Sequence, residues 1–162
     1  MKSGTFGKAL AVLLLCLGAI RPALADNLMA GSWTIVRAEA APWSDNKADL
    51  PNWSAMPEYV GKRVTFAAGR IDGPHLLACD KPVYEMSDSP AAGLFQGGLG
   101  TFEDSGGKKA EDTATAIGFA KRPIKTLMTG CEHSIDYHMS DANHAAFALD
   151  NMIFWLKRDG TP

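Results

Sequence analysis

The C-terminal part of this sequence carries its clearest hydrophobic pattern, and that pattern predicts β-strands. In residues 132–139, the apolar side chains of Ile135, Tyr137 and Met139 alternate with polar ones. An extended chain places successive side chains on opposite faces, so this segment is typical of a strand with one buried face and one polar face. Such a strand must pair with others to cover its apolar side.

Two turns divide the remainder of this region. Residues 140–143 are turn formers, and the pair Asp150-Asn151 tolerates the positive φ angles that a two-residue hairpin turn requires. These turns separate apolar runs at 145–149 and 152–158. We expect the two runs to be the last two strands of the fold, joined as a hairpin.

Shorter segments of the same kind come earlier in the chain. Alternation and β-branched residues predict further strands at 31–39, 60–67, 70–72 and 83–86. Residues 109–119, with apolar positions at helical spacing, are the one segment predicted to be a helix. The sequence therefore predicts a mainly β fold: an antiparallel β-barrel or half-barrel of about seven to eight strands, with one helix in an insertion.

The first 25 residues have the layout of a secretory signal peptide. Lysines flank its start, an apolar run follows at 9–20, and the small residues of the Ala-Leu-Ala motif at 23–25 suit a signal peptidase. We therefore expect cleavage after Ala25, which leaves a single periplasmic or secreted domain of residues 26–162.

Two alternatives to a cleaved signal need to be weighed. A permanent membrane anchor requires about 20 consecutive apolar residues, whereas the apolar run here ends at Arg21-Pro22. A lipoprotein would use Cys16, but lipid attachment usually follows a small residue and Leu15 is large. Cleavage is therefore favoured, and no stable membrane span is expected.

Removal of this leader changes the charge of the chain. The loss of Lys2, Lys8 and Arg21 from 16 basic residues leaves 13, against 18 acidic residues that all remain, so the domain carries a net charge of −5. Nucleic-acid binding depends on Lys and Arg side chains that neutralise phosphates. An anionic membrane surface attracts the same groups. The composition therefore argues against both partners.

The domain keeps two cysteines, Cys79 and Cys131. An even pair in an oxidising compartment most simply forms one disulfide. The alternatives are a redox pair or a pair of metal thiolates, but catalytic redox pairs usually have the close spacing C-x-x-C. We therefore expect a structural disulfide between these residues.

The four tryptophans fall into two groups. Trp33 and Trp155 lie in expected strands, so we assign them to the core. Trp43 and Trp53 lie in residues 40–59, where three prolines make regular structure improbable. Aromatic side chains in such a loop can line the mouth of a pocket or face a partner.

Phe95 raises the same question in a second irregular segment. It follows Leu94 in residues 87–100, which are rich in Gly, Ser and Pro. Either residue could anchor the segment in the core. We nevertheless take Phe95, with Trp43 and Trp53, as the expected ligand-binding residues.

Acidic and histidine side chains gather between residues 132 and 144. On a strand, Asp136 and His138 would share one face, where a carboxylate and an imidazole could bind Zn²⁺. Polar residues on the solvated face of an edge hairpin explain the same pattern. The sequence has no nucleophile elbow and no phosphate loop. We therefore expect no catalytic residue, no bound metal and no cofactor.

These segments carry a family resemblance. Gly31-x-Trp33 at the start of the first strand resembles lipocalin-like (calycin) barrels. A second set of motifs is similar to small periplasmic domains of the META/HslJ type, and comprises Val64-Thr65-Phe66, Ile71-Asp72-Gly73, Cys79, Tyr84, Thr129-Gly130-Cys131, Leu149 and Phe154. The resemblance implies binding or envelope upkeep rather than a defined reaction.

The leading hypothesis is an exported, non-enzymatic domain that binds a small apolar ligand or an envelope protein. Two alternatives from other classes stay open. A proteinaceous inhibitor of a hydrolase, such as a lysozyme or a protease, would insert the loop 40–59 into an enzyme cleft. A metal-using enzyme would act at Asp136 and His138.

Overall fold

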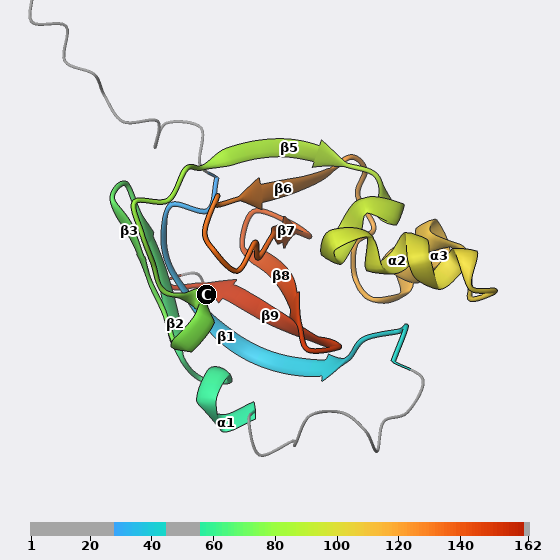
Figure 1. Cartoon of the computed structure of the whole chain (residues 1–162), viewed down its shortest axis with the longest axis horizontal. Coiled ribbons are helices and arrows are strands. Elements are labelled where there is room, and N and C mark those ends of the chain that lie inside the picture. Colours follow the sequence, from blue (N-terminus) through green and yellow to red (C-terminus); the bar gives the residue numbers. More distant parts are fainter. Residues whose placement is uncertain (1–27, 45–55, 161–162) are drawn as a thin grey trace, which may run out of the picture.

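Nine antiparallel strands form one sheet that curls into a half-barrel (Figure 1). The computed structural model describes residues 28–44 and 56–160. The strands are β1 (Gly31–Ala40), β2 (Arg63–Ala67), β3 (Arg70–Asp72), β4 (Cys79–Asp80), β5 (Glu85–Ser89), β6 (Ile124–Met128), β7 (Tyr137–Met139), β8 (His144–Leu149) and β9 (Met152–Arg158). The expected mainly β, antiparallel fold is confirmed, with nine strands in the described residues instead of the expected seven to eight.

The strand order in the sheet is β4-β3-β2-β1-β9-β8-β7-β6-β5. The predicted C-terminal hairpin is present, because β8 pairs with β9 up to Leu149 opposite Met152. Asp150 and Asn151 form its turn with φ angles of 49° and 61°. The first and last long strands, β1 and β9, also pair along most of their length.

The inner face of the half-barrel is filled by side chains, many of them aromatic. The ring of Phe66 meets Tyr137 at 4.9 Å between centroids, and Tyr137 meets Phe147 at 5.4 Å. Phe154 continues the chain of contacts, at 5.1 Å from Phe147 and 5.2 Å from Tyr59. These rings belong to one buried cluster together with the fully buried tryptophan of β1. The inside of the curl is therefore a packed core.

A second core lies between the outer face of the sheet and two helices, α2 (Leu94–Asp104) and α3 (Ala110–Ala116). Strand β9 contributes Ile153 and Trp155 to it, while the small Ala146 of β8 leaves room for the helices. Figure 1 shows α2 and α3 together beside the curled sheet. The assignment of Trp33 and Trp155 to core positions is confirmed.

The helices differ from the sequence-based expectation. The predicted helix at 109–119 is α3, which is shorter because the chain turns at Gly118 with φ +117°. Helix α2 and the short α1 (Met56–Tyr59) lie in segments expected to be irregular. The glycines of α2 lower its intrinsic propensity, but burial of Leu94 and Leu99 stabilises it. Two 3₁₀ turns complete the described elements, η2 (His75–Leu77) and η3 (Ala91–Gly93).

We looked for membrane-spanning helices among residues 28–44 and 56–160. None of the helices found there combines the length and the apolar composition that a membrane crossing requires.

The half-barrel is open between its end strands, and covalent and polar links cross this opening. The predicted disulfide is confirmed: Cys79 of β4 is bonded to Cys131, which follows β6. The hydroxyl of Tyr84, just before β5, donates to the carbonyl of Ala67 at 2.8 Å. Both links join the β2–β4 side of the sheet to the β5–β6 side. They hold the curl where strand pairing does not.

We predict that the disulfide contributes strongly to stability. A cross-link over 52 residues restricts the unfolded chain, and the loop-entropy relation gives about 4 kcal/mol. Replacing both Cys79 and Cys131 with Ser should lower the urea midpoint accordingly, while the secondary structure seen by circular dichroism is kept. Equal midpoints for the oxidised wild type and the double variant would contradict the role of the bond across the opening.

Candidate ligand-binding site

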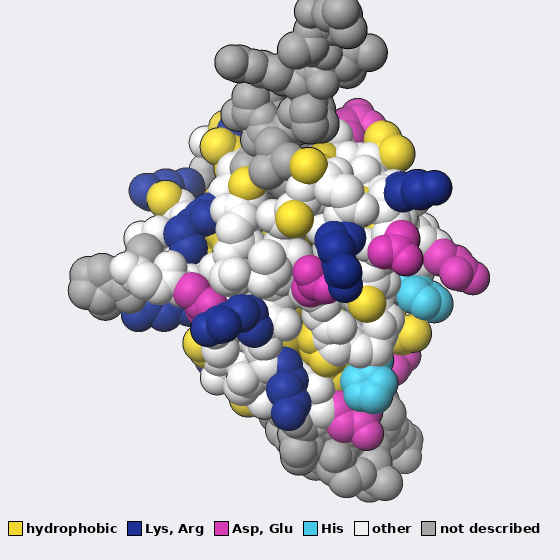
Figure 2. All heavy atoms as spheres, turned by 90° about the vertical axis from the view of Figure 1, so that its left-hand side faces the viewer, with side chains coloured by type: hydrophobic (Ala, Val, Ile, Leu, Met, Phe, Trp, Pro, Cys, Tyr) yellow, Lys and Arg dark blue, Asp and Glu magenta, His cyan; other side chains and the backbone are white. Residues whose placement is uncertain are grey.

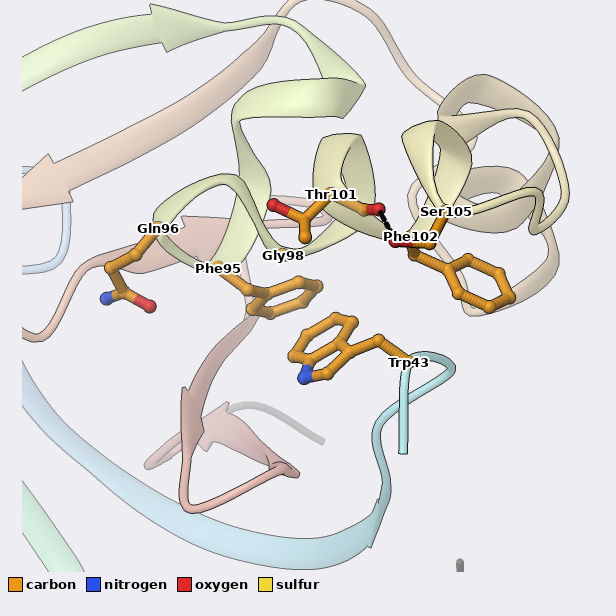
Figure 3. Close-up of a pocket in the computed structure, with 7 residues that line it drawn as sticks. All are labelled: Trp43, Phe95, Gln96, Gly98, Thr101, Phe102 and Ser105. Carbon is orange, nitrogen blue, oxygen red and sulfur yellow. Dashed lines mark hydrogen bonds between the residues drawn. The ribbon is translucent and has the colours of Figure 1, made fainter. Parts of the chain in front are cut away.

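A pocket of about 360 Å³ opens between the loop after β1 and helix α2. Figure 3 shows the indole of Trp43 lying against the ring of Phe95, with Gln96 and Phe102 at opposite ends. The described lining consists of Trp43, Phe95, Gln96, Gly98, Thr101, Phe102 and Ser105. None of these side chains is charged, so the pocket presents aromatic surface together with neutral hydrogen-bonding groups.

Trp43 is held in place by contacts on several sides. Its indole Nε1 donates to the Oδ1 of Asn151 at 3.1 Å, which attaches the loop to the β8–β9 turn. Its ring centroid lies 5.7 Å from that of Phe95. The edge of the indole packs on Gly98, where a Cβ atom would approach it to 3.1 Å. A side chain at position 98 would therefore require the indole to shift by a few tenths of an ångström, whereas glycine allows this close packing.

The start of α2 has an unusual backbone. Phe95, Gln96 and Gly97 all have positive φ angles, of 56°, 54° and 83°, so three successive residues form a left-handed turn. For a residue with a Cβ atom this conformation costs about 1–2 kcal/mol. Such strain persists only where neighbouring groups hold it, and it clusters at functional sites. We refer to residues 95–97 as the left-handed turn.

Two hydrogen bonds secure the left-handed turn. The backbone N–H of Phe95 donates to Nε2 of His138 at 2.8 Å, and the side-chain amide of Gln96 donates to the carbonyl of Ser134 at 3.1 Å. The side chains of Leu94 and Phe95 are also buried in the second core. The turn is thus anchored to the sheet and to the segment before β7.

His138 is a buried polar residue beneath the helices. Its Nδ1 lies 2.9 Å from the hydroxyl of Thr126. Since the N–H of Phe95 can only donate, Nε2 must be unprotonated, and the proton of the neutral ring is on Nδ1 and is donated to Thr126. Burial lowers the pKa of His138 to about 3. The expectation of a solvated face is therefore wrong for His138, because α2 covers it.

The arrangement around Asp136 and His138 does not favour a metal site. Both ring nitrogens of His138 have protein partners. Asp136 precedes β7 and is half-buried, and burial raises the pKa of its carboxyl group. Within residues 28–44 and 56–160, no three His, Cys, Asp or Glu side chains are grouped so that they could hold a metal ion.

Charges are mixed on the side of the molecule that carries β2 and β3. Figure 2 shows Lys and Arg side chains interspersed with Asp and Glu on this face. Arg63 of β2 pairs with Asp159 at 2.7 Å, and Arg70 of β3 pairs with Asp72. The opposite charges within each pair offset one another. The face shown in Figure 2 therefore has no large patch of a single charge.

The structure brings two of the three expected ligand-binding residues together. Trp43 and Phe95 meet across the pocket, although they lie in different segments of the sequence. Trp53 lies outside the described residues. The other pocket residues of α2, such as Thr101 and Phe102, were not predicted, because the glycines in this segment weaken the helical pattern of the sequence. The spacing of Leu99 and Phe102, three residues apart, was the signal that could have indicated a helical face.

Comparisons with known protein families, with curated proteins and with solved structures give no match to this chain. What is established is therefore the architecture: an antiparallel half-barrel of nine strands whose opening is crossed by a disulfide. A disulfide of this kind is typical of proteins in oxidising compartments outside the cytoplasm.

The left-handed turn leads to a prediction about Gly97. A Cβ at this position would meet nothing within 4 Å, so the cost of Gly97→Ala is conformational and should be about 1–2 kcal/mol of unfolding free energy. Gly69→Ala is the matched control, because Gly69 also has open space and lacks a positive φ. Urea unfolding of both variants checks this. Equal losses would contradict the strained geometry of the turn.

The burial of His138 predicts an acid-dependent loss of stability. Above about pH 6.5 the ring is neutral in both the folded and the unfolded chain. Between that pH and the folded pKa of about 3, only the unfolded chain binds a proton, so stability falls as the pH falls.

The contribution of His138 to the change of the unfolding free energy with pH should be at most about 1.4 kcal/mol per pH unit. His138→Gln should remove it, whereas replacement of the exposed His133 by Gln should leave it unchanged. Urea unfolding between pH 7 and pH 4 is the measurement. A slope that is the same with and without His138 would show that this ring is not buried in the neutral form.

Proposed function

We propose that this chain is an exported, non-enzymatic binding domain whose pocket between Trp43 and helix α2 takes a small, neutral, largely apolar ligand. The observation that carries the proposal is the pocket itself, built by two aromatic rings and a strained left-handed turn. Its volume of about 360 Å³ falls in the range typical of small-molecule sites. Strained backbone beside a preformed pocket is more typical of a site than of a simple connection.

The side chains around the pocket suggest the chemistry of the ligand. The rings of Trp43 and Phe95 suit a flat apolar face. The hydroxyl of Thr101 and the amide oxygen of Gln96 are neutral groups that could accept hydrogen bonds at the edge of that face. The hydroxyl of Ser105 already donates to the Thr101 carbonyl at 2.8 Å. A ligand with one apolar face and a polar, uncharged edge fits best.

In this proposal the ligand binds outside the curl of the sheet. Ring-to-ring contacts occupy the inner face, whereas the pocket lies on the helical side. The resemblance to lipocalin-like and META/HslJ-type domains supports an exported binding role, and the signal-peptide layout of the first 25 residues supports cleavage after Ala25. It does not carry over an internal ligand cavity, because the inner core is filled in this chain.

We predict that the neutral apolar fluorophore N-phenyl-1-naphthylamine binds this pocket, with an increase in its emission. Thr101→Arg fills the pocket with a charged side chain and should weaken binding by about tenfold or more. Ala116→Arg is the control, since it adds the same group at an exposed position of α3 away from the pocket lining. Both affinities are measured by fluorescence titration of folded protein.

Equal affinities for the two arginine variants would place the fluorophore elsewhere and overturn the assignment of the pocket. No binding by the wild type to this probe or to a panel of small apolar ligands would count against a small-molecule role. Recovery of an envelope protein with the wild type but not with Thr101→Arg would instead assign the same surface to a protein partner.

A further inference from the structure

Part of the pocket lining comes from the left-handed turn, and one residue of the sheet is in direct contact with this turn. Phe95 and Gln96 line the pocket and belong to the turn. His138 of β7 touches the turn twice. It accepts the N–H of Phe95 at 2.8 Å, and its ring meets the Phe95 ring edge-on at 5.0 Å.

His138 is itself fixed from the neighbouring strand. It lies directly opposite Thr126 in the β6–β7 pairing, and the two side chains are joined by the 2.9 Å hydrogen bond. Both residues are almost completely buried, with 1% and 2% of their surface exposed. A continuous set of contacts therefore runs from the sheet through His138 to the backbone of the pocket.

We propose that His138 is a positioning residue for the Trp43–Phe95 pocket: its unprotonated Nε2 holds the N–H of Phe95 and thereby keeps residues 95–97 in the left-handed conformation that binds ligand. This inference rests on the proposed function of the pocket. The role of Thr126 is to keep the proton on Nδ1, so that Nε2 remains an acceptor.

Packing alone does not explain a histidine at this place. The surrounding core is apolar, and a leucine would fill much of the volume at a lower desolvation cost. What a leucine cannot supply is an acceptor for the Phe95 N–H, which would be left buried and unpaired. The position therefore requires an acceptor at the distance of Nε2 from the backbone.

Two amide variants separate the positioning role from a general loss of packing. In His138→Gln, the side-chain oxygen can reach the position of Nε2 and accept the Phe95 N–H. In His138→Asn, the shorter side chain can replace only Nδ1 and can hydrogen-bond Thr126, but it leaves the Phe95 N–H without an acceptor. Tyr84→Phe is the control, because it also removes one side-chain-to-backbone hydrogen bond, at the opening of the half-barrel.

The experiment compares two readouts on the folded proteins. The first is amide hydrogen exchange of Phe95 by NMR, which needs no ligand. The second is the affinity for N-phenyl-1-naphthylamine. We expect His138→Asn to lose protection of the Phe95 amide and to bind about tenfold more weakly. His138→Gln should stay close to the wild type in both, and Tyr84→Phe should lose stability without a change in affinity.

The outcomes distinguish this inference from the proposed function. If His138→Asn binds the probe as tightly as the wild type, or if Gln and Asn weaken binding equally, the positioning role is overturned while the pocket stands. If the wild type binds neither this probe nor the panel of small apolar ligands in the pocket, the proposed function fails. The hydrogen exchange of the Phe95 amide still tests the hydrogen bond to His138 in that case. Unchanged protection of this amide in His138→Asn would refute the hydrogen bond.

Discussion

Strand β9 is buried on both faces, and both cores of this protein depend on it. Its alternate residues point to opposite sides: Met152, Phe154 and Leu156 enter the inner core, whereas Ile153 and Trp155 enter the outer one. The strand pairs with β1 on one side and β8 on the other. Because the side-chain period of a strand is two residues, a slip of one residue would exchange the two sets. The position of the helices is therefore tied to the register of this strand.

The second core combines apolar packing with one buried polar connection. Small residues of β8 leave space for α2 and α3, and the space is filled by aromatic rings such as Phe119, which stacks on Trp155 at 5.4 Å. Within this apolar region, His138 and Thr126 form a satisfied polar pair that reaches the backbone of α2. A buried polar group with all its partners specifies a unique arrangement. Here that arrangement is the strained turn under the pocket.

Several features could be predicted from the sequence because they depend on local patterns. The alternation around Tyr137 and the turn at Asp150-Asn151 predicted strands that the structure contains. The even number of cysteines expected to remain after cleavage at Ala25 predicted the bond between Cys79 and Cys131. Each of these inferences uses neighbouring residues or a simple count. None requires knowledge of which distant segments meet.

Helix α2 and the candidate site could not be predicted in the same way. Its glycines weaken the helical signal, and the positive φ angles of Phe95 and Gln96 go against the preference of both residues. That conformation is held by contacts with the sheet and with the segment before β7. The meeting of Trp43 with Phe95 likewise depends on Asn151, which is more than one hundred positions away from Trp43 in the chain.

The sequence by itself determined the β character, the C-terminal hairpin and the cysteine pairing, together with the expectation of export. These follow from periodicity, turn chemistry and composition, which are local or additive properties. Tertiary structure alone decided that His138 is buried and neutral, and that a pocket lies on the helical side of the sheet. The physical reason is that burial and backbone strain are set by what packs against a residue, and that partner comes from a distant part of the chain.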